Sequence, residues 1–145
     1  MIQPPRPLDE GTRLAALHRL NTLDGFRQED INQIVRVAHD TFATKFVFIA
    51  FIFEHRKHIQ ASVGLSFDEA DREMSFCAHT ILQDDVFIVP DATADRRFFD
   101  NPLVTGEPGV RFYAGAPIKS PDGYKVGTLC VADPRPRSLR PHEVS

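Results

Sequence analysis

The sequence predicts an α+β fold in which an antiparallel sheet lies between helices. An apolar stripe at helical spacing ends at Phe42, and a run of β-branched and aromatic residues begins almost directly after it. Farther along, two apolar segments flank a Ser-Pro-Asp-Gly turn. The length of 145 residues fits one domain, and 42% hydrophobic with 26% charged residues is typical of globular proteins.

Two helices are expected near the amino end, after an irregular lead-in at residues 1–13. Leucines recur at helical spacing from Leu14 to Leu20 and predict a short helix that stops before the turn-prone pair Asp24-Gly25. The apolar stripe of the second helix is wide enough to cover a sheet. Its members are Ile31, Ile34, Val35, Ala38 and Phe42.

Five segments are expected to be strands. Residues 46–53, FVFIAFIF, are apolar throughout and predict a strand buried on both faces. Residues 58–64 alternate weakly and should pair with it as a hairpin, and residues 86–90 predict a short strand. Residues 110–120 and 124–132 flank the turn and predict a second hairpin whose strands are central in the sheet.

A third helix is expected at about residues 71–83, followed by an irregular connection at residues 91–109. The connection contains Phe98, Phe99 and Leu103. A long loop with large apolar side chains usually folds over another part of the molecule, so we expect a short helix and a lid.

The stretch SFCAHT, residues 75–80, lies on this third helix. Positions two apart on a helix are rotated by about 200°, so Cys77 and His79 should point to opposite sides and cannot form a thiol–imidazole pair. Cys77 shares the apolar stripe of Met74 and is expected to be a small buried hydrophobe. Ser75 lies one turn before His79, and the two form a polar pair that either lines a pocket or stabilises the helix.

Four motifs occur in order along the chain. They are R-x-x-S-F-C-A-H-T-I-L from Arg72, V-P-D-A-T-A-D-R-R-F-F-D-N-P-L-V from Val89, R-F-Y-A-G-A-P from Arg111 and G-T-L-C-V-A-D-P-R-P-R from Gly127. Together they resemble the GAF domains of bacterial sensor proteins, over residues 14–139. The resemblance implies a GAF/PAS-like sandwich with an antiparallel five- or six-stranded sheet. It also implies a ligand pocket between one sheet face and the third helix with the lid.

The resemblance also implies a domain organisation and partners. Residues 1–145 are expected to be a single GAF domain of the type found at the amino end of sensor histidine kinases and diguanylate cyclases. Residues 140–145, with Pro141 and Glu143, fit the first turn of the long helix that follows the last strand in this family. The chain is then either a fragment whose C-terminal output module is a kinase or cyclase, or a natural chain that ends early. In either case the face that this long helix would cover is expected to be partly exposed, and an exposed apolar face favours a homodimer.

Arg111 and Tyr113 are two apart in a predicted strand and therefore share a face. The lid brings Asp91, Asp95 and Asp100 near them. Arg111 either forms ion pairs with these carboxylates and so holds the lid in place, or binds an anionic ligand. The candidate pocket residues are Ser75, Phe76, His79, Asp91, Phe98, Phe99, Arg111, Tyr113 and Thr128.

Several other site chemistries are not expected. In GAF domains that bind a linear tetrapyrrole covalently, histidine directly follows the cysteine of this helix, whereas Ala78 intervenes here. The signature of cyclic-nucleotide-binding GAF domains is not found in order. Glu54, His55 and His58 lack the closed set of four ligands of a structural zinc site, so no metal is expected. Some GAF-fold proteins reduce free methionine sulfoxide with three cysteines, but this chain has two.

Charge and hydropathy argue against two classes of binding partner, nucleic acid and membrane. The net charge of −3 and pI near 6.0 give no basic footprint for nucleic acid. The longest apolar run is far shorter than the ~20 residues of a membrane span, and the amino end has no apolar signal core. We therefore expect a cytoplasmic protein that binds neither nucleic acid nor membrane, with reduced cysteines.

The leading functional prediction is a non-catalytic sensory domain that binds a small ligand and signals through dimer or output-module contacts. One alternative is a dimerisation module without a ligand. Another is a redox enzyme of the methionine sulfoxide reductase kind.

Overall fold

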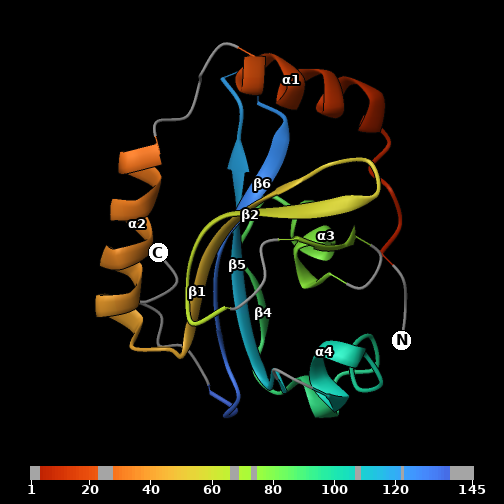
Figure 1. The fold of residues 1–145 in the computed structure, drawn as a ribbon. Coiled ribbons are helices and arrows are strands. Elements are labelled where there is room, and N and C mark those ends of the chain that lie inside the picture. The colour runs from red at the N-terminus through yellow and green to blue at the C-terminus, as the bar shows by residue number, and fades with distance from the viewer. Residues whose placement is uncertain are drawn as a thin grey trace.

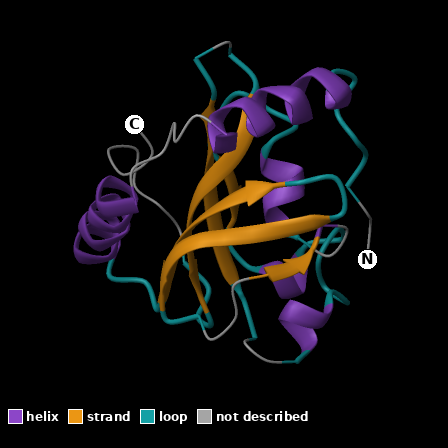
Figure 2. Cartoon of the chain, turned by 45° about the horizontal axis from the view of Figure 1, so that its top comes forward, coloured by secondary structure: helices purple, strands orange, loops and turns teal. Residues whose placement is uncertain are grey.

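The computed structural model describes residues 4–22, 28–65, 69–72, 75–106, 109–121 and 123–137. Six antiparallel strands form one sheet in the order β3-β2-β1-β6-β5-β4, with helices on both sides (Figures 1 and 2). The predicted α+β sandwich is thereby confirmed. The helices are α1 (Glu10–Thr22), α2 (Gln28–Phe42), α3 (Phe76–Thr80), the short 3-10 helix η2 (Ala92–Ala94) and α4 (Pro102–Thr105). The strands are β1 (Phe46–Ile52), β2 (Arg56–Val63), β3 (Glu69–Asp71), β4 (Phe87–Val89), β5 (Phe112–Lys119) and β6 (Lys125–Asp133).

The central strand β1 separates two hydrophobic cores, because alternate side chains of a strand point to opposite faces. Phe46 and Phe48 pack on the side of α3 and α4, whereas Val47 and Ile49 pack on the side of α1 and α2. All seven residues of β1 are buried, as the uninterrupted apolar run predicts. The hairpin of β5 and β6 is also confirmed, and neither strand lies at an edge of the sheet.

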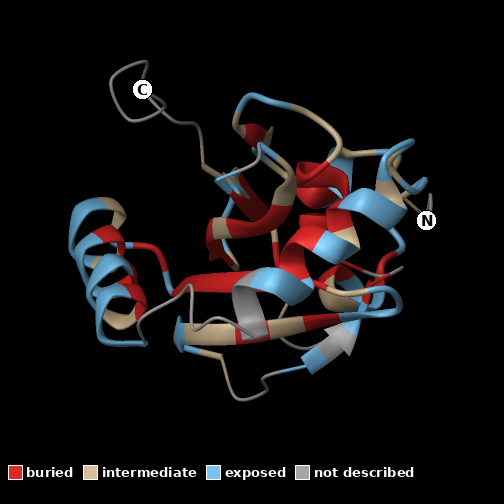
Figure 3. Ribbon diagram, turned by 90° about the horizontal axis from the view of Figure 1, so that it is seen from above, coloured by how far each residue is buried: buried red, intermediate tan, exposed pale blue. Residues whose placement is uncertain are grey.

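Helix α2 covers the sheet with only part of its predicted stripe. Ile31, Val35 and Ala38 are buried, but Ile34 is 48% exposed and its neighbour Val37 is 57% exposed. Figure 3 shows that the outer side of this helix is exposed along its length. The helix therefore contacts the sheet along a narrower strip than the sequence predicts.

The predicted third helix, at about residues 71–83, is too long at both ends, because α3 spans only Phe76–Thr80. Residues 69–71 form strand β3 at the edge of the sheet, and α3 begins only at Phe76. Arg56 on β2 lies 3.3 Å from Glu69 and 3.6 Å from Asp71, and such opposite charges on adjacent strands stabilise their pairing. Strand β3 is not predicted from the sequence, because three residues are too few to show an alternation.

Two boundary predictions have different outcomes. The lead-in ends earlier than residue 13, because α1 begins at Glu10 after a turn in which the Glu10 amide donates to the Pro7 carbonyl. The predicted helix start at residues 140–145 lies outside the described residues, as does Met74. In the part of the chain that the structure describes, no helix has the length and apolar character needed to span a bilayer.

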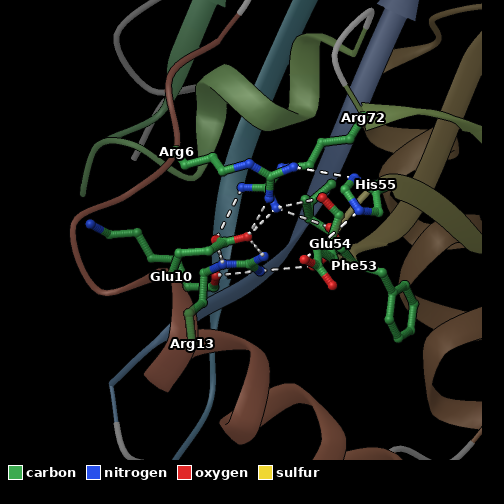
Figure 4. Close-up of polar contacts among 9 residues, drawn as sticks. Arg6, Glu10, Arg13, Phe53, Glu54, His55 and Arg72 are labelled. Atoms are coloured by element: carbon green, nitrogen blue, oxygen red, sulfur yellow. Dashed lines mark hydrogen bonds and ion pairs between the residues drawn. The ribbon is translucent and has the colours of Figure 1, made fainter.

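A buried charge cluster fastens α1 to the end of β1 (Figure 4). Arg13 and Arg72 are 1% and 3% exposed, and both donate hydrogen bonds to the carboxylate of Glu10. Arg13 also donates to the carbonyl of Ile52 at 2.8 Å, and Arg72 donates to that of Phe53 at 3.0 Å. These contacts position the segment that leads into α3.

The Glu10 carboxylate is expected to make folding stability sensitive to acid. Burial acts to raise its pKa, but hydrogen bonds from Arg72 and Arg13 outweigh burial and lower the pKa from 4.5 to about 2. The contribution is therefore complete above pH 4.5 and is lost as the pH falls from there through about 2. After allowing for solvent screening, we expect Glu10 to contribute roughly 1–2 kcal/mol at neutral pH.

Urea unfolding of the wild type and Glu10→Gln between pH 7 and pH 2 would measure this contribution. The difference in free energy of unfolding between the two proteins should shrink as the pH falls below 4.5. Glu29→Gln, at an exposed position in the first turn of α2, is the matched control and should differ less from the wild type at neutral pH. A pH-independent difference for Glu10→Gln would contradict the assignment.

Candidate functional site

A small cavity lies between the sheet and the layer of α3 and α4. Its volume is about 30 Å³, which is room for about one water molecule. The place agrees with the pocket that the family resemblance implies. It is lined by Phe46, Phe48, Lys57, Leu65, Phe76, Leu103, Val110, Tyr113 and Ala132.

Lys57 gives this apolar cavity a positive charge. The residue lies on β2 and is 4% exposed, and its ammonium stands over the ring of Phe48, 5.1 Å from the centroid. Among the described residues, no carboxylate lies within ion-pair distance of it. A cation–π contact offsets only part of the cost of burying an ammonium. The cavity wall therefore holds a cation whose charge is not neutralised by an acidic side chain.

Lys57 is not among the candidate residues predicted from the sequence, because it lies between the two predicted strands 46–53 and 58–64, where a hairpin turn is expected. Strand β2 begins at Arg56, so Lys57 and Ile59 point to the same buried face. Alternate residues of a strand share a face, so extending the predicted strand two residues back from Ile59 would have placed Lys57 on the buried face.

The candidate aromatic residues of α3 and the lid pack on one another. The rings of Phe76 and Phe98 stack with centroids 4.1 Å apart, and Tyr113 lies 5.0 Å from Phe76. His79 packs edge-on against Phe98 at 4.9 Å. Phe76 and Tyr113 line the cavity, whereas Phe98 and His79 form the layer that supports it. Phe99 is 53% exposed and takes no part in this packing.

The predicted polar pair of Ser75 and His79 is wrong. Ser75 precedes the first residue of α3, but its side chain does not cap the helix. Its hydroxyl oxygen is buried and has no hydrogen-bond partner among the described residues, so it makes no hydrogen bond to His79. Neither residue lines the cavity.

Arg111 holds the lid, but not through the predicted carboxylates. Its guanidinium donates at 2.7 Å to the carbonyl of Val104, at the end of α4. Asp91 instead accepts hydrogen bonds from the backbone and side chain of Thr93, and Asp95 pairs with Arg97 at 2.8 Å. The local geometry explains the difference, because an aspartate readily bonds groups two residues farther along the chain.

The two cysteines meet in the core directly beside the cavity wall. Cys77 on α3 and Cys130 on β6 are both fully buried, and their Sγ atoms are 3.5 Å apart. The Tyr113 hydroxyl lies 3.0 Å from Cys130 Sγ and 3.6 Å from Cys77 Sγ. The Cys130 thiol donates to Thr128 at 3.1 Å, so the candidate Thr128 belongs to this cluster and not to the cavity wall. We call the two thiols with Tyr113 and Thr128 the thiol cluster.

The thiols of this cluster differ in acidity. Burial acts to raise the pKa of Cys77, but contact with the Cys130 thiol, the charge of Lys57 and the hydroxyls of Thr128 and Tyr113 outweigh burial and lower the pKa. Burial raises the pKa of Cys130, and the neighbouring Cys77 raises it further. Burial also raises the pKa of Tyr113, so its hydroxyl stays protonated and able to donate. Cys77 is thus the more readily ionised thiol of the pair.

Comparisons with known proteins agree with the fold and the motifs. A model of the GAF domain family matches residues 27–145. A cyclic di-GMP phosphodiesterase of Pseudomonas aeruginosa is 43% identical over 137 residues, which are 94% of this chain and 23% of that protein. The chain therefore spans about a quarter of the length of this relative.

Solved structures with low sequence identity share the fold. The GAF domain of the Acinetobacter phosphoenolpyruvate-protein phosphotransferase is 16% identical with a TM-score of 0.62, covering 90% of this chain and 82% of that one. The free methionine-R-sulfoxide reductase from Neisseria meningitidis is 11% identical with a TM-score of 0.64, covering 99% and 86%. At such identities the likeness establishes the architecture alone.

Proposed function

We propose, on the premise that the chain belongs to the GAF domain family, that it is a non-catalytic sensory domain that binds a small organic anion. The observation that carries this proposal is Lys57, a buried ammonium in an apolar cavity with no acidic partner among the described residues. A carboxylate with a short apolar body would neutralise the ammonium and leave its hydrocarbon against Phe46 and Leu65. Burial of the pair in these surroundings would make the charge interaction strong.

The cavity would have to widen to accept such a ligand, because an organic anion is larger than one water molecule. The movable wall is the lid, where Leu103 lines the cavity, and Val110, the residue directly after the lid, lines it as well. The lid is held by the bond from Arg111 to Val104 and by the stack of Phe98 on Phe76. A ligand that displaces these contacts would favour a second lid position, and differential affinity for the two positions would shift their populations.

The change in lid position would regulate an output module that lies outside these 145 residues in a longer signalling protein. The similarity to a cyclic di-GMP phosphodiesterase, of which the chain spans about a quarter, supports a domain that regulates an attached output module. We propose that the lid position is communicated to that module, a kinase, cyclase or phosphodiesterase, through contacts of the terminal helices in a homodimer. Ile34 and Val37, exposed on α2, offer an apolar surface for such a contact.

Ligand binding can be tested by thermal unfolding with straight-chain carboxylic acids from acetate to hexanoate, at constant ionic strength. At least one acid should raise the Tm of the wild type, because a ligand that binds only the folded state stabilises it. The uncharged amide of the same length should have little effect. Lys57→Met should weaken binding of that acid by about tenfold or more, the loss expected for a buried charged partner.

Lys45→Met is the matched control, because Lys45 also stands over a phenylalanine ring, that of Phe46, but is exposed. It should leave binding unchanged. Equal effects of acid and amide, or unaltered binding by Lys57→Met, would contradict the role of Lys57. If no acid changes the Tm and the protein is dimeric in light scattering, the dimerisation module without a ligand becomes the better explanation.

A further inference from the structure

The pair Cys77 and Cys130 has the placement of a redox site. The two residues lie 53 positions apart in the chain, yet the fold brings their Sγ atoms to 3.5 Å. A disulfide has an S–S length of about 2.05 Å, so bond formation needs an approach of only about 1.5 Å. These are the two cysteines of the 145 residues, so a disulfide between residues of this domain must join them.

The surroundings of the pair suit thiol chemistry better than an inert core does. The Tyr113 hydroxyl lies within 3.6 Å of both sulfurs and also contacts the hydroxyl of Thr80 at 2.8 Å. Thr128 accepts the Cys130 proton at 3.1 Å. A hydroxyl that donates to sulfur, as Tyr113 does to Cys77, stabilises the thiolate, which is the reactive form of cysteine. A cysteine that served packing alone would need only apolar neighbours.

We propose that Cys77 and Cys130 form a redox-active dithiol that a small peroxide oxidises to a disulfide linking α3 to β6. Cys77, whose sulfur accepts a hydrogen bond from the Tyr113 hydroxyl, is the attacking thiol, and Cys130, which donates its proton to Thr128, is the resolving thiol. Tyr113 belongs both to the cavity wall and to the thiol cluster, so the cavity lies next to the pair, and an oxidant in the cavity would have to pass this ring to reach the sulfurs. The cavity takes one molecule of about the size of water, and hydrogen peroxide is little larger.

The reaction balances in two steps. The Cys77 thiolate attacks one oxygen of hydrogen peroxide, the O–O bond breaks, and the leaving hydroxide takes a proton to become water, which leaves a sulfenic acid on Cys77. Cys130 then attacks the Cys77 sulfur, its proton passes to the departing oxygen, and a second water is released. Two thiols are oxidised by two electrons, and one peroxide is reduced to two waters. A thiol reductant reverses the change by exchange.

Oxidation would alter the wall of the cavity. Formation of the S–S bond pulls α3 towards β6, and Phe76, which lines the cavity, directly precedes Cys77. It also removes the thiol proton donated to Thr128. The redox state of the pair would therefore be transmitted to the same wall that contacts the lid.

The test is the rate of disulfide formation in folded and unfolded protein. Reduced wild type is treated with hydrogen peroxide, quenched at intervals with N-ethylmaleimide in denaturant, and weighed as the intact chain. We expect loss of two hydrogens and of both alkyl adducts, reversed by dithiothreitol. The folded protein should react at least about tenfold faster than the chain in urea, because the fold holds the thiols at a far higher effective concentration. Thiols that stay reduced when folded but oxidise in urea would overturn the proposal.

Variants separate the proposed roles. Cys130→Ser should accumulate a sulfenic acid on Cys77 that dimedone traps, whereas Cys77→Ser should give less of this product. Tyr113→Phe keeps the ring and removes the hydroxyl, so it should slow oxidation several-fold while leaving the circular dichroism spectrum unchanged. If Tyr113→Phe oxidises at the wild-type rate, the hydroxyl has no role in thiol reactivity. Equal dimedone labelling of the two cysteine variants would overturn the assignment of Cys77 as the attacking thiol.

Discussion

Replacement of Arg13 by methionine should lower the free energy of unfolding by about 3–5 kcal/mol, which is a large share of the ~5–15 kcal/mol typical of a domain. The guanidinium is 1% exposed and donates to the carboxylate of Glu10 and to the carbonyls of Ile52 and Lys125. Methionine fills similar space but donates no hydrogen bond, so the Ile52 carbonyl loses this donor in a buried place. Urea unfolding monitored by circular dichroism measures the loss.

Arg6 provides the matched control, because it pairs with the same carboxylate at 3.0 Å but its side chain is 41% exposed. Arg6→Met should change stability by less than about 1 kcal/mol, as exposed ion pairs do. Arg13→Lys keeps the charge and cannot make all the contacts of the planar guanidinium, so its stability should be intermediate. Equal effects of Arg6→Met and Arg13→Met would show that burial does not determine the strength of this cluster.

The elements with long apolar patterns could be predicted from the sequence. Strand β1 and the hairpin of β5 and β6 are buried over many consecutive residues, and hydrophobic periodicity alone identifies them. Strand β3 has only three residues. It forms because it pairs with residues 56–58 of β2, and because Arg56 on β2 attracts Glu69 on β3. Contacts between residues distant in sequence are not visible in a local pattern, so β3 was not predicted, and its last residue, Asp71, was placed in the third helix.

The candidate site was predictable in place but not in chemistry. Phe76 and Tyr113 line the cavity as predicted, because strand and helix periodicity decide which side chains face the core. Helical geometry predicts that Cys77 and His79 point to different sides of α3. It could not reveal that Cys77 meets Cys130, since that contact joins segments 53 residues apart. The same limit applies to Arg111, whose partner is a backbone carbonyl and thus has no signature in the sequence.

Replacement of Gly115 on β5 by alanine should destabilise the protein, because there is no space for a side chain at this position. A Cβ built there would collide with the Tyr113 hydroxyl oxygen, and would lie 2.8 Å from Cζ of that ring and 2.9 Å from the Thr80 hydroxyl. Tyr113 cannot move aside freely, because Phe76 and Phe87 pack against its ring. Gly115→Ala should therefore lower the free energy of unfolding by about 1–3 kcal/mol, the usual cost of overpacking. Urea unfolding measures it.

Gly11→Ala is the matched control, because a Cβ at this α1 position meets no other atom within 4 Å. Alanine should stabilise the helix there by up to about 1 kcal/mol. The two substitutions should therefore change the free energy of unfolding in opposite directions, although each adds one methyl group. The glycine of β5 leaves the space in which the Tyr113 hydroxyl contacts both thiols, so Gly115→Ala should also slow peroxide oxidation of Cys77 and Cys130. A Gly115→Ala protein with wild-type stability would show that the ring shifts easily, and the thiol cluster would then not be a fixed arrangement.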